Sequence, residues 1–184
     1  MRFSALALMA LAITACGERR VQAQACHAEA AHQIYWSDAA DADVITASAQ
    51  GEDCASASVT LRIRNAAGDE LWRHDSTYHA MTSGGSPPAQ LRPVTLEEMQ
   101  AVLAGWANVT TMRASELPPW TQQADQPGAP GALALSTPLA RDAYQALRGN
   151  DAAVICLAMD VTRSECMTYD AQTRAAAPVL ASGA

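Results

Sequence analysis

The stretch of this chain that most constrains its fold is SVTLRIR, residues 58–64, in which valine, leucine and isoleucine alternate with polar residues. Successive side chains of a β-strand point to opposite faces of a sheet, so this period of two predicts a strand with one buried face. The turn-forming stretch NAAGD follows. The sequence therefore predicts an antiparallel pair of strands here. If Ile63 lies opposite Trp72, His74 lies on the inner face near Leu61, whereas a shift of one residue in the register would turn His74 to solvent.

A second hairpin is predicted near the end of the chain, in residues 153–171. Pairing Cys156 with Cys166 across it centres the turn on Val161. The apolar side chains of this segment then gather on one face and a disulfide lies on the other, because neighbouring residues of a strand point to opposite faces. Those apolar residues are Ile155, Leu157, Met159, Met167 and Tyr169.

The cysteine content adds a further constraint. Apart from Cys16 the chain holds four cysteines, and an even number in an exported chain indicates two disulfides. Four cysteines allow three pairings. The hairpin favours the pairing of Cys156 with Cys166, which leaves Cys26 to pair with Cys54.

Two helices are predicted between the early and the late strands. Thr95 and Glu98 fit a capping box, and apolar residues follow at helical spacing. The second helix is expected to begin at Thr137-Pro138 and to end at Gly149. With two further strands in HQIYWS and ADVITASA, this order predicts an α+β domain, an antiparallel sheet of about six strands with two helices inserted before a C-terminal disulfide-bonded hairpin.

The start of the chain has the pattern of a targeting segment. Arg2 precedes an apolar run that ends at Ala15 and is too short to cross a hydrocarbon core, which needs roughly 20 residues. The tetrapeptide ITAC, residues 13–16, resembles the lipobox of bacterial lipoproteins. This resemblance implies that Cys16 becomes the first mature residue and carries the lipid that anchors the protein to a membrane. Gly17 in place of an aspartate implies the outer membrane of a Gram-negative cell, facing the periplasm.

An alternative cleavage site lies in AQA, residues 23–25. Cleavage after Ala25 would release a soluble, secreted protein that begins at Cys26. We favour the lipobox because the apolar run ends beside it and charged residues lie between the two sites. The expected organisation is a signal peptide (1–15), a lipid-anchored tether (16–30), a single α+β periplasmic domain (31–175) and a flexible tail (176–184).

The charge of the chain narrows its possible partners. The formal net charge is −7, all 12 basic residues are arginine, and there is no lysine. Nucleic-acid binding depends on clusters of cations, so no nucleic-acid partner is expected. The absence of lysine excludes a P-loop and a Schiff-base lysine. No cofactor is expected.

The four histidines, His27, His32, His74 and His79, form two pairs with a spacing of five residues. This spacing points paired side chains to opposite faces of a strand, and it matches neither a zinc-protease motif nor a Cys/His zinc site. No metal site and no catalytic residue are therefore expected. The alternative hypothesis is a periplasmic metal-binding or hydrolytic protein that uses His74, Asp75 and His79.

Residues 115–136 form a long connection rich in proline and glycine. Loops of this length in a compact domain are usually functional or disordered, and aromatic anchors beside prolines are common in protein recognition. Trp120, with Pro118 and Pro119, is therefore the candidate partner-binding residue. The alternative is that Trp120 folds back to cover the second helix.

These features predict a non-enzymatic, lipid-anchored envelope protein that binds an unknown envelope protein through its loops. In format it resembles the small envelope lipoproteins that inhibit lysozyme-type hydrolases or confer immunity to secreted toxins. In the C-type lysozyme inhibitors a reactive loop reads S-G-x-x-Y. Here SGGS, residues 83–86, is followed by Pro87 in place of the tyrosine.

Overall fold

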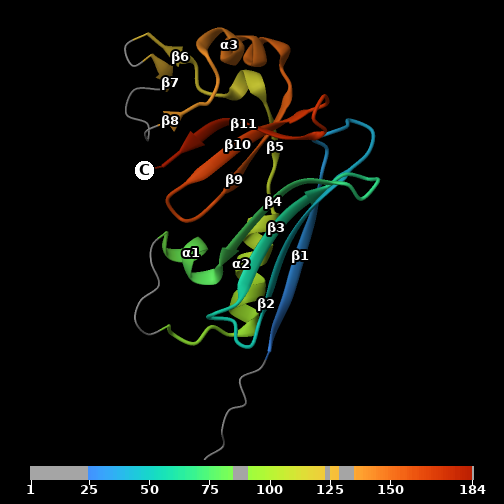
Figure 1. The fold of residues 1–184 in the computed structure, drawn as a ribbon, viewed down its shortest axis with the longest axis vertical. Coiled ribbons are helices and arrows are strands. Elements are labelled where there is room, and N and C mark those ends of the chain that lie inside the picture. The colour runs from blue at the N-terminus through green and yellow to red at the C-terminus, as the bar shows by residue number, and fades with distance from the viewer. Residues whose placement is uncertain (1–24, 85–90, 123–124, 129–134, 184) are drawn as a thin grey trace, which may run out of the picture.

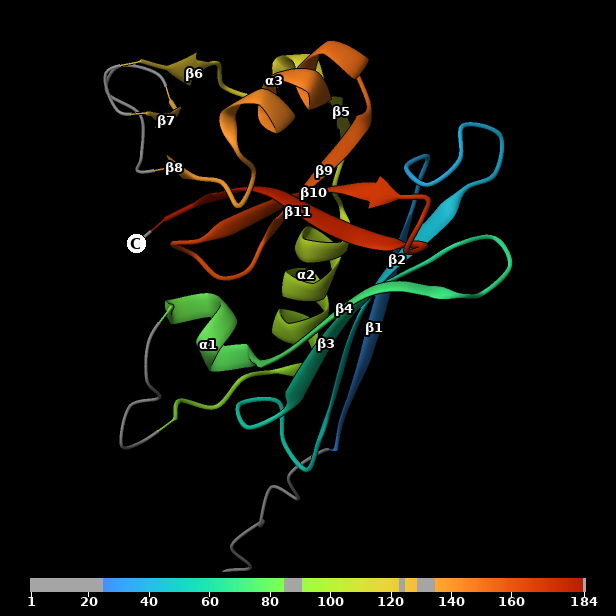
Figure 2. The ribbon, with the colours of Figure 1, turned by 45° about the horizontal axis from the view of Figure 1, so that its top comes forward.

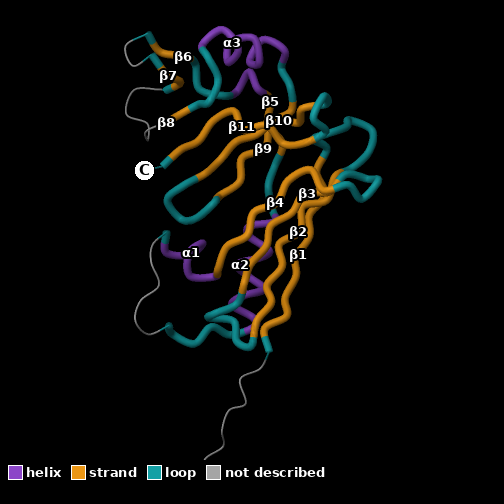
Figure 3. The backbone as a smooth tube through the Cα atoms, in the orientation of Figure 1, coloured by secondary structure: helices purple, strands orange, loops and turns teal. Residues whose placement is uncertain are grey.

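The computed structural model describes residues 25–84, 91–122, 125–128 and 135–183. It is a mixed α+β structure with antiparallel sheets, which confirms the expected fold class at this level (Figure 3). Along the chain the elements are β1 (Cys26–Ile34), β2 (Asp43–Gly51), β3 (Ser58–Arg64), β4 (Glu70–Thr77), α1 (Tyr78–Ser83), α2 (Leu96–Ala107), β5 (Thr111–Arg113), the 3-10 helix η1 (Ala114–Glu116), β6 (Trp120–Thr121), β7 (Gln126–Pro127), β8 (Leu135–Ser136), α3 (Arg141–Asn150), β9 (Ala153–Ala158), β10 (Ser164–Asp170) and β11 (Ala175–Ser182).

The first four strands form a four-stranded sheet in chain order, in the lower half of Figure 1. Its register places Ile63 opposite Trp72 and Leu61 opposite His74, which is the first of the two registers considered for this hairpin. In the middle of β1 and β2 the inward-facing positions carry small side chains, with Ala28 opposite Ala49 and Ala30 opposite Ala47. These alanines leave room for α2 to lie directly on that face (Figure 2).

Helix α2 begins with the predicted capping box. The Thr95 side chain accepts a hydrogen bond from the Glu98 backbone, and the Glu98 carboxylate accepts one from the Thr95 backbone. Met99 and Leu103 are completely buried on the side of the helix that meets the sheet. The helix therefore closes the core of the four-stranded sheet.

The five-stranded sheet, in the order β5-β9-β10-β11-β8, lies across the middle of the molecule. Ile155, Leu157 and Met167 face the core shared with the four-stranded sheet and α2. The alternate residues of β9 and β10 face a second apolar cluster beneath α3, which includes Tyr144. This sheet is buried on both faces and joins the two halves of the protein.

Both predicted disulfides are present, Cys26–Cys54 and Cys156–Cys166. Cys156 lies opposite Cys166 in the β9–β10 hairpin, and the pair belongs to the cluster beneath α3. The apolar side chains Ile155 and Met167 lie on the other face, as the predicted hairpin requires. None of the helices among the described residues has the length and apolar character needed to cross a membrane.

The expected single sheet of about six strands is wrong, because the described strands form sheets of four, five and two strands. A third helix, α1, follows β4 directly. Thr77 caps it by accepting a hydrogen bond from the Ala80 backbone, and Gly84 ends it in the left-handed conformation. A helix of six residues carries too little periodicity to be recognised in the sequence.

Three boundaries also differ from the expected ones. β1 begins at Cys26, within the segment expected to be a tether, because its disulfide to Cys54 and its pairing with β2 order it. Residues 175–182 form β11 instead of a flexible tail, and Pro178 lies at a bulge where strand pairing is irregular. Helix α3 begins at Arg141 instead of Pro138, with Ala140 at its N-cap, and the Thr137 hydroxyl donates to the Val179 carbonyl while it accepts a hydrogen bond from the Leu139 backbone.

Candidate binding groove

A groove of 760 Å³ lies where the end of β1 and the β1–β2 loop meet β5. Its walls are residues 32–39 and 109–113, and Glu116 and Ala153 complete it. β1 and β5 are each the outermost strand of their sheet. The groove is therefore bordered by two sheet edges, a position that the sequence analysis did not identify.

The groove combines an apolar floor with one prominent aromatic side chain. Tyr35 is 57% exposed, whereas its neighbours Ile34 and Trp36 are each 4% exposed and belong to the core. Val109 and Met112 line the other wall and are half-buried. Partly exposed aromatic residues beside apolar surface are common anchors in protein recognition.

The β1–β2 loop that carries Tyr35 is held by a buried carboxylate. Asp43 is 1% exposed and accepts hydrogen bonds from the backbone of Trp36 (3.2 Å) and of Ser37 (2.6 Å). The Ser37 hydroxyl donates to the second carboxylate oxygen at 2.5 Å. These bonds fix the loop on both sides of the turn, so Tyr35 is presented by a constrained backbone.

The adjacent pair Tyr35-Trp36 is a sequence signal for an exposed aromatic residue. Adjacent aromatic residues in an extended segment point to opposite sides, so Tyr35 and Trp36 cannot both enter the same core. One of the pair is exposed wherever only one side of the segment is covered. The pattern could not identify which one, because that depends on where the loop packs.

The three residues of the alternative hypothesis do not form one site. His74 lies on the half-buried face of β4, stacked on Trp72 with ring centroids 6.0 Å apart. Asp75 is exposed and accepts hydrogen bonds from Arg73 and Thr60, which lower its pKa to about 2. His79 lies on α1. Among the described residues no group of three or more metal-binding side chains occurs.

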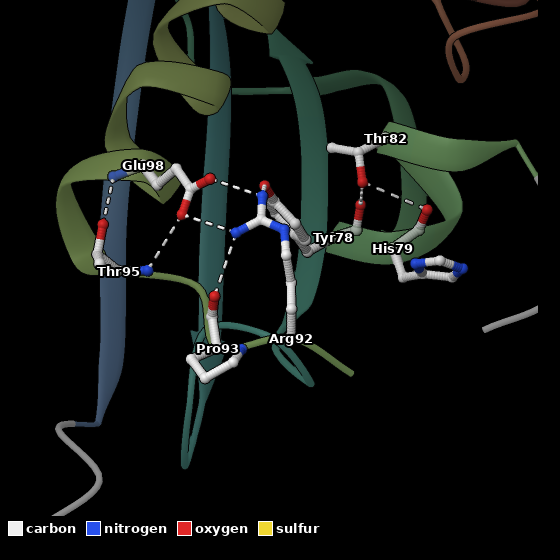
Figure 4. A network of polar contacts seen from close by, with 7 residues as sticks. All are labelled: Tyr78, His79, Thr82, Arg92, Pro93, Thr95 and Glu98. Carbon is white, nitrogen blue, oxygen red and sulfur yellow. Dashed lines mark hydrogen bonds and ion pairs between the residues drawn. The ribbon is translucent and has the colours of Figure 1, made fainter. Parts of the chain in front are cut away.

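His79 belongs instead to a smaller hollow of 440 Å³ beside α1. The Ser83 hydroxyl lies 2.9 Å from the ring nitrogen Nε2 of His79, but it also lies 2.8 Å from the His79 carbonyl, which can accept its proton. Arg92, on the opposite side of this hollow, is held by the Glu98 carboxylate and reaches the Tyr78 hydroxyl (Figure 4). The histidine and serine are thus adjacent, but the arginine is already engaged.

The candidate residues of the proline-rich loop pack against α3. The Trp120 ring meets Tyr144 edge to face, with centroids 5.8 Å apart, and its indole N–H donates to Asp125. The Tyr144 hydroxyl donates to the Pro118 carbonyl at 2.8 Å, and Pro119 follows in the same segment. Trp120 is half-buried against the cluster beneath α3, which corresponds to the alternative considered for it. Its role in binding a partner stays a prediction.

Two sequence-based candidates lie outside the described residues. They are the proposed lipidation site Cys16 and the end of the SGGSPP stretch, residues 85–88. The described part of that stretch, Ser83 and Gly84, ends α1.

Replacing Trp120 with alanine should lower the free energy of unfolding by about 2 kcal/mol, because the substitution removes a half-buried ring and an aromatic pair. Trp120→Phe is the matched control and should retain most of the stability. Urea unfolding followed by circular dichroism measures both. An unchanged stability in Trp120→Ala would mean that the ring does not support the fold.

His74 should make stability depend on pH. Its burial lowers its pKa below the ordinary value of 6.5, so the folded protein disfavours the charged form that the unfolded chain accepts. The free energy of unfolding should therefore decrease as the pH falls below 6.5. Urea unfolding at pH 7 and pH 5 should show a smaller decrease in His74→Gln than in the wild type. Equal decreases in both proteins would contradict this prediction.

Comparison with known proteins gives the chain no family. No family model, no curated protein and no solved structure matches it. The groove, which is lined by the exposed Tyr35 and bordered by two sheet edges, is the feature of the described residues best suited to binding a partner.

Proposed function

We propose that the chain is a lipid-anchored envelope protein that binds another protein through the groove between β1 and β5, without catalysing a reaction. The observation that carries this proposal is an exposed tyrosine on a constrained loop above an apolar floor. The groove is open and large enough for several side chains of a partner. An inhibitor or an immunity-type protein would act in this way.

The membrane attachment proposed at Cys16 gives the groove an orientation. The anchor would precede β1, and the groove lies at the far end of that strand. Nine residues of strand span about 26 Å. The groove would then open away from the membrane, toward the periplasm, where a partner could reach it. Cleavage after Ala25 would instead give a soluble secreted protein with the same groove.

The charge distribution fits a basic partner. The protein has a formal net charge of −7, and Asp38 and Glu116 lie along the groove. Arg113 also lines it and its side chain donates to the Asp151 carbonyl. Complementary charge would mainly increase the rate of association.

The attachment is tested by the intact mass of the protein purified from its own envelope fraction without reduction. We expect a chain that begins at Cys16, carries acyl groups and has four hydrogens fewer than the reduced chain. In a Cys16→Ser variant the acyl mass should be absent. A wild-type mass that begins at Cys26 without lipid would contradict the anchor, while the groove proposal would remain.

The groove is tested by site-specific photo-crosslinking in the native envelope. Tyr35 is replaced with benzoylphenylalanine, and Val161, which is 64% exposed on the β9–β10 turn, receives the same substitution as a control. We expect a discrete protein adduct from position 35 and none of the same mass from position 161. Identical adducts from both positions, or none from position 35, would overturn the proposed binding surface.

The hydrolytic alternative has one supporting observation, the 2.9 Å contact between Ser83 and His79. An activated serine would be labelled covalently by a fluorophosphonate, and Ser83→Ala would abolish the label. Labelling of the wild type alone would favour this second function.

A further inference from the structure

The outer edge of β5 presents backbone groups to the groove. β5 pairs with β9 on one side and is the outermost strand of the five-stranded sheet. The register sets Thr111 opposite Ile155 and Arg113 opposite Ala153. What a partner can bind here depends on which of these backbone groups point away from β9.

One hydrogen bond fixes that direction. The Ala114 backbone N–H donates to the Ala152 carbonyl at 2.8 Å. Ala114 and Ala152 therefore continue the β5–β9 register by one residue, as a hydrogen-bonded pair. Hydrogen-bonded and non-hydrogen-bonded pairs alternate along an antiparallel ladder. Met112 therefore directs its backbone groups toward β9, whereas Thr111 and Arg113 direct theirs to the outer edge.

The outer edge is only partly occupied. The Arg113 backbone N–H donates to the Glu116 carboxylate at 2.7 Å, so this N–H is already hydrogen-bonded and is not available to a partner. Among the described residues, no strand pairs with the outer side of β5 at Thr111. The Arg113 carbonyl accepts the first hydrogen bond of η1, so the N–H and the carbonyl of Thr111 remain, and these can form two hydrogen bonds with another backbone.

The side chains around this edge suit an extended peptide. Thr111 and Arg113 are exposed and Met112 is half-buried, so alternate positions of an added strand would meet polar and apolar surface. Tyr35 lies across the groove, where the Thr111 hydroxyl donates to its carbonyl at 3.4 Å. An added strand would run along the free edge of β5, with this tyrosine beside it.

We propose that the groove binds an extended segment of another protein, which joins the five-stranded sheet as a strand beside β5 by pairing with the backbone of Thr111. The inference rests on the proposed function, since it assumes that the groove is the binding surface. Free backbone donors and acceptors at a sheet edge are complementary to another peptide backbone, and strand addition is an established mode of peptide recognition. Glu116 limits the free edge to a short length, which favours a short segment over a long self-pairing strand.

The test uses a phage-displayed library of random nine-residue linear peptides, selected on the purified full chain. Thr111→Pro removes the outward N–H without removing a bond to β9, because proline is tolerated at such edge positions. Thr111→Ser and Thr111→Ala keep the N–H and serve as controls, with and without the hydroxyl. We expect the selected peptides to bind the proline variant at least tenfold more weakly than either control.

A second measurement does not depend on the variants. In the wild type, the selected peptide should slow hydrogen exchange of the Thr111 amide and leave the Met112 amide, which already faces β9, nearly unchanged. A library that yields no binding peptide would overturn strand addition. So would equal binding to the proline variant together with an unprotected Thr111 amide.

The outcomes separate this inference from the proposed function. If binding is lost in Tyr35→Ala but kept in Thr111→Pro, the groove binds its partner without strand addition, and the inference alone fails. If neither substitution changes the affinity, the peptides bind elsewhere, and both proposals fail. Peptides that weaken in both variants support the two together.

Discussion

The alternation of side chains along β9 and β10 is the constraint on which this structure depends. One set of residues, including Ile155 and Met167, enters the core shared with the four-stranded sheet, and the other set, including Cys156 and Cys166, enters the cluster beneath α3. A sheet that buries both faces must be covered on both sides. The four-stranded sheet with α2 provides one cover, and α3 with the segment around Trp120 provides the other.

The groove follows from how the two sheets meet. Each open antiparallel sheet has two edge strands, and the packing brings the edge strand β1 and the edge strand β5 to the same place. Exposed edges invite pairing with other chains unless they are short or covered. Here β5 is three residues long and Glu116 covers one of its donors, while Asp43 fixes the loop opposite. An edge restricted in this way suits selective binding better than open-ended association.

The chemically suggestive residues of the sequence have mainly structural surroundings. His74 is stacked on Trp72, Asp75 is paired with Arg73, and Trp120 packs on Tyr144. Tyr35, which the sequence analysis assigned to a strand, has the largest exposed aromatic surface at the groove. The residue types and their spacing in the sequence do not show which of these side chains support the fold and which are available to a partner.

The sequence by itself determined the local features: the capping box at Thr95, the strand pair on either side of the turn at residues 65–69, and the hairpin that pairs Cys156 with Cys166. These depend on residues close in the chain, where side-chain period and turn chemistry specify the geometry. Tertiary structure alone decided that the strands divide into separate sheets, that the last residues join β10 as β11, and that two edges meet at a groove. Those outcomes depend on contacts between distant segments, which local patterns do not encode.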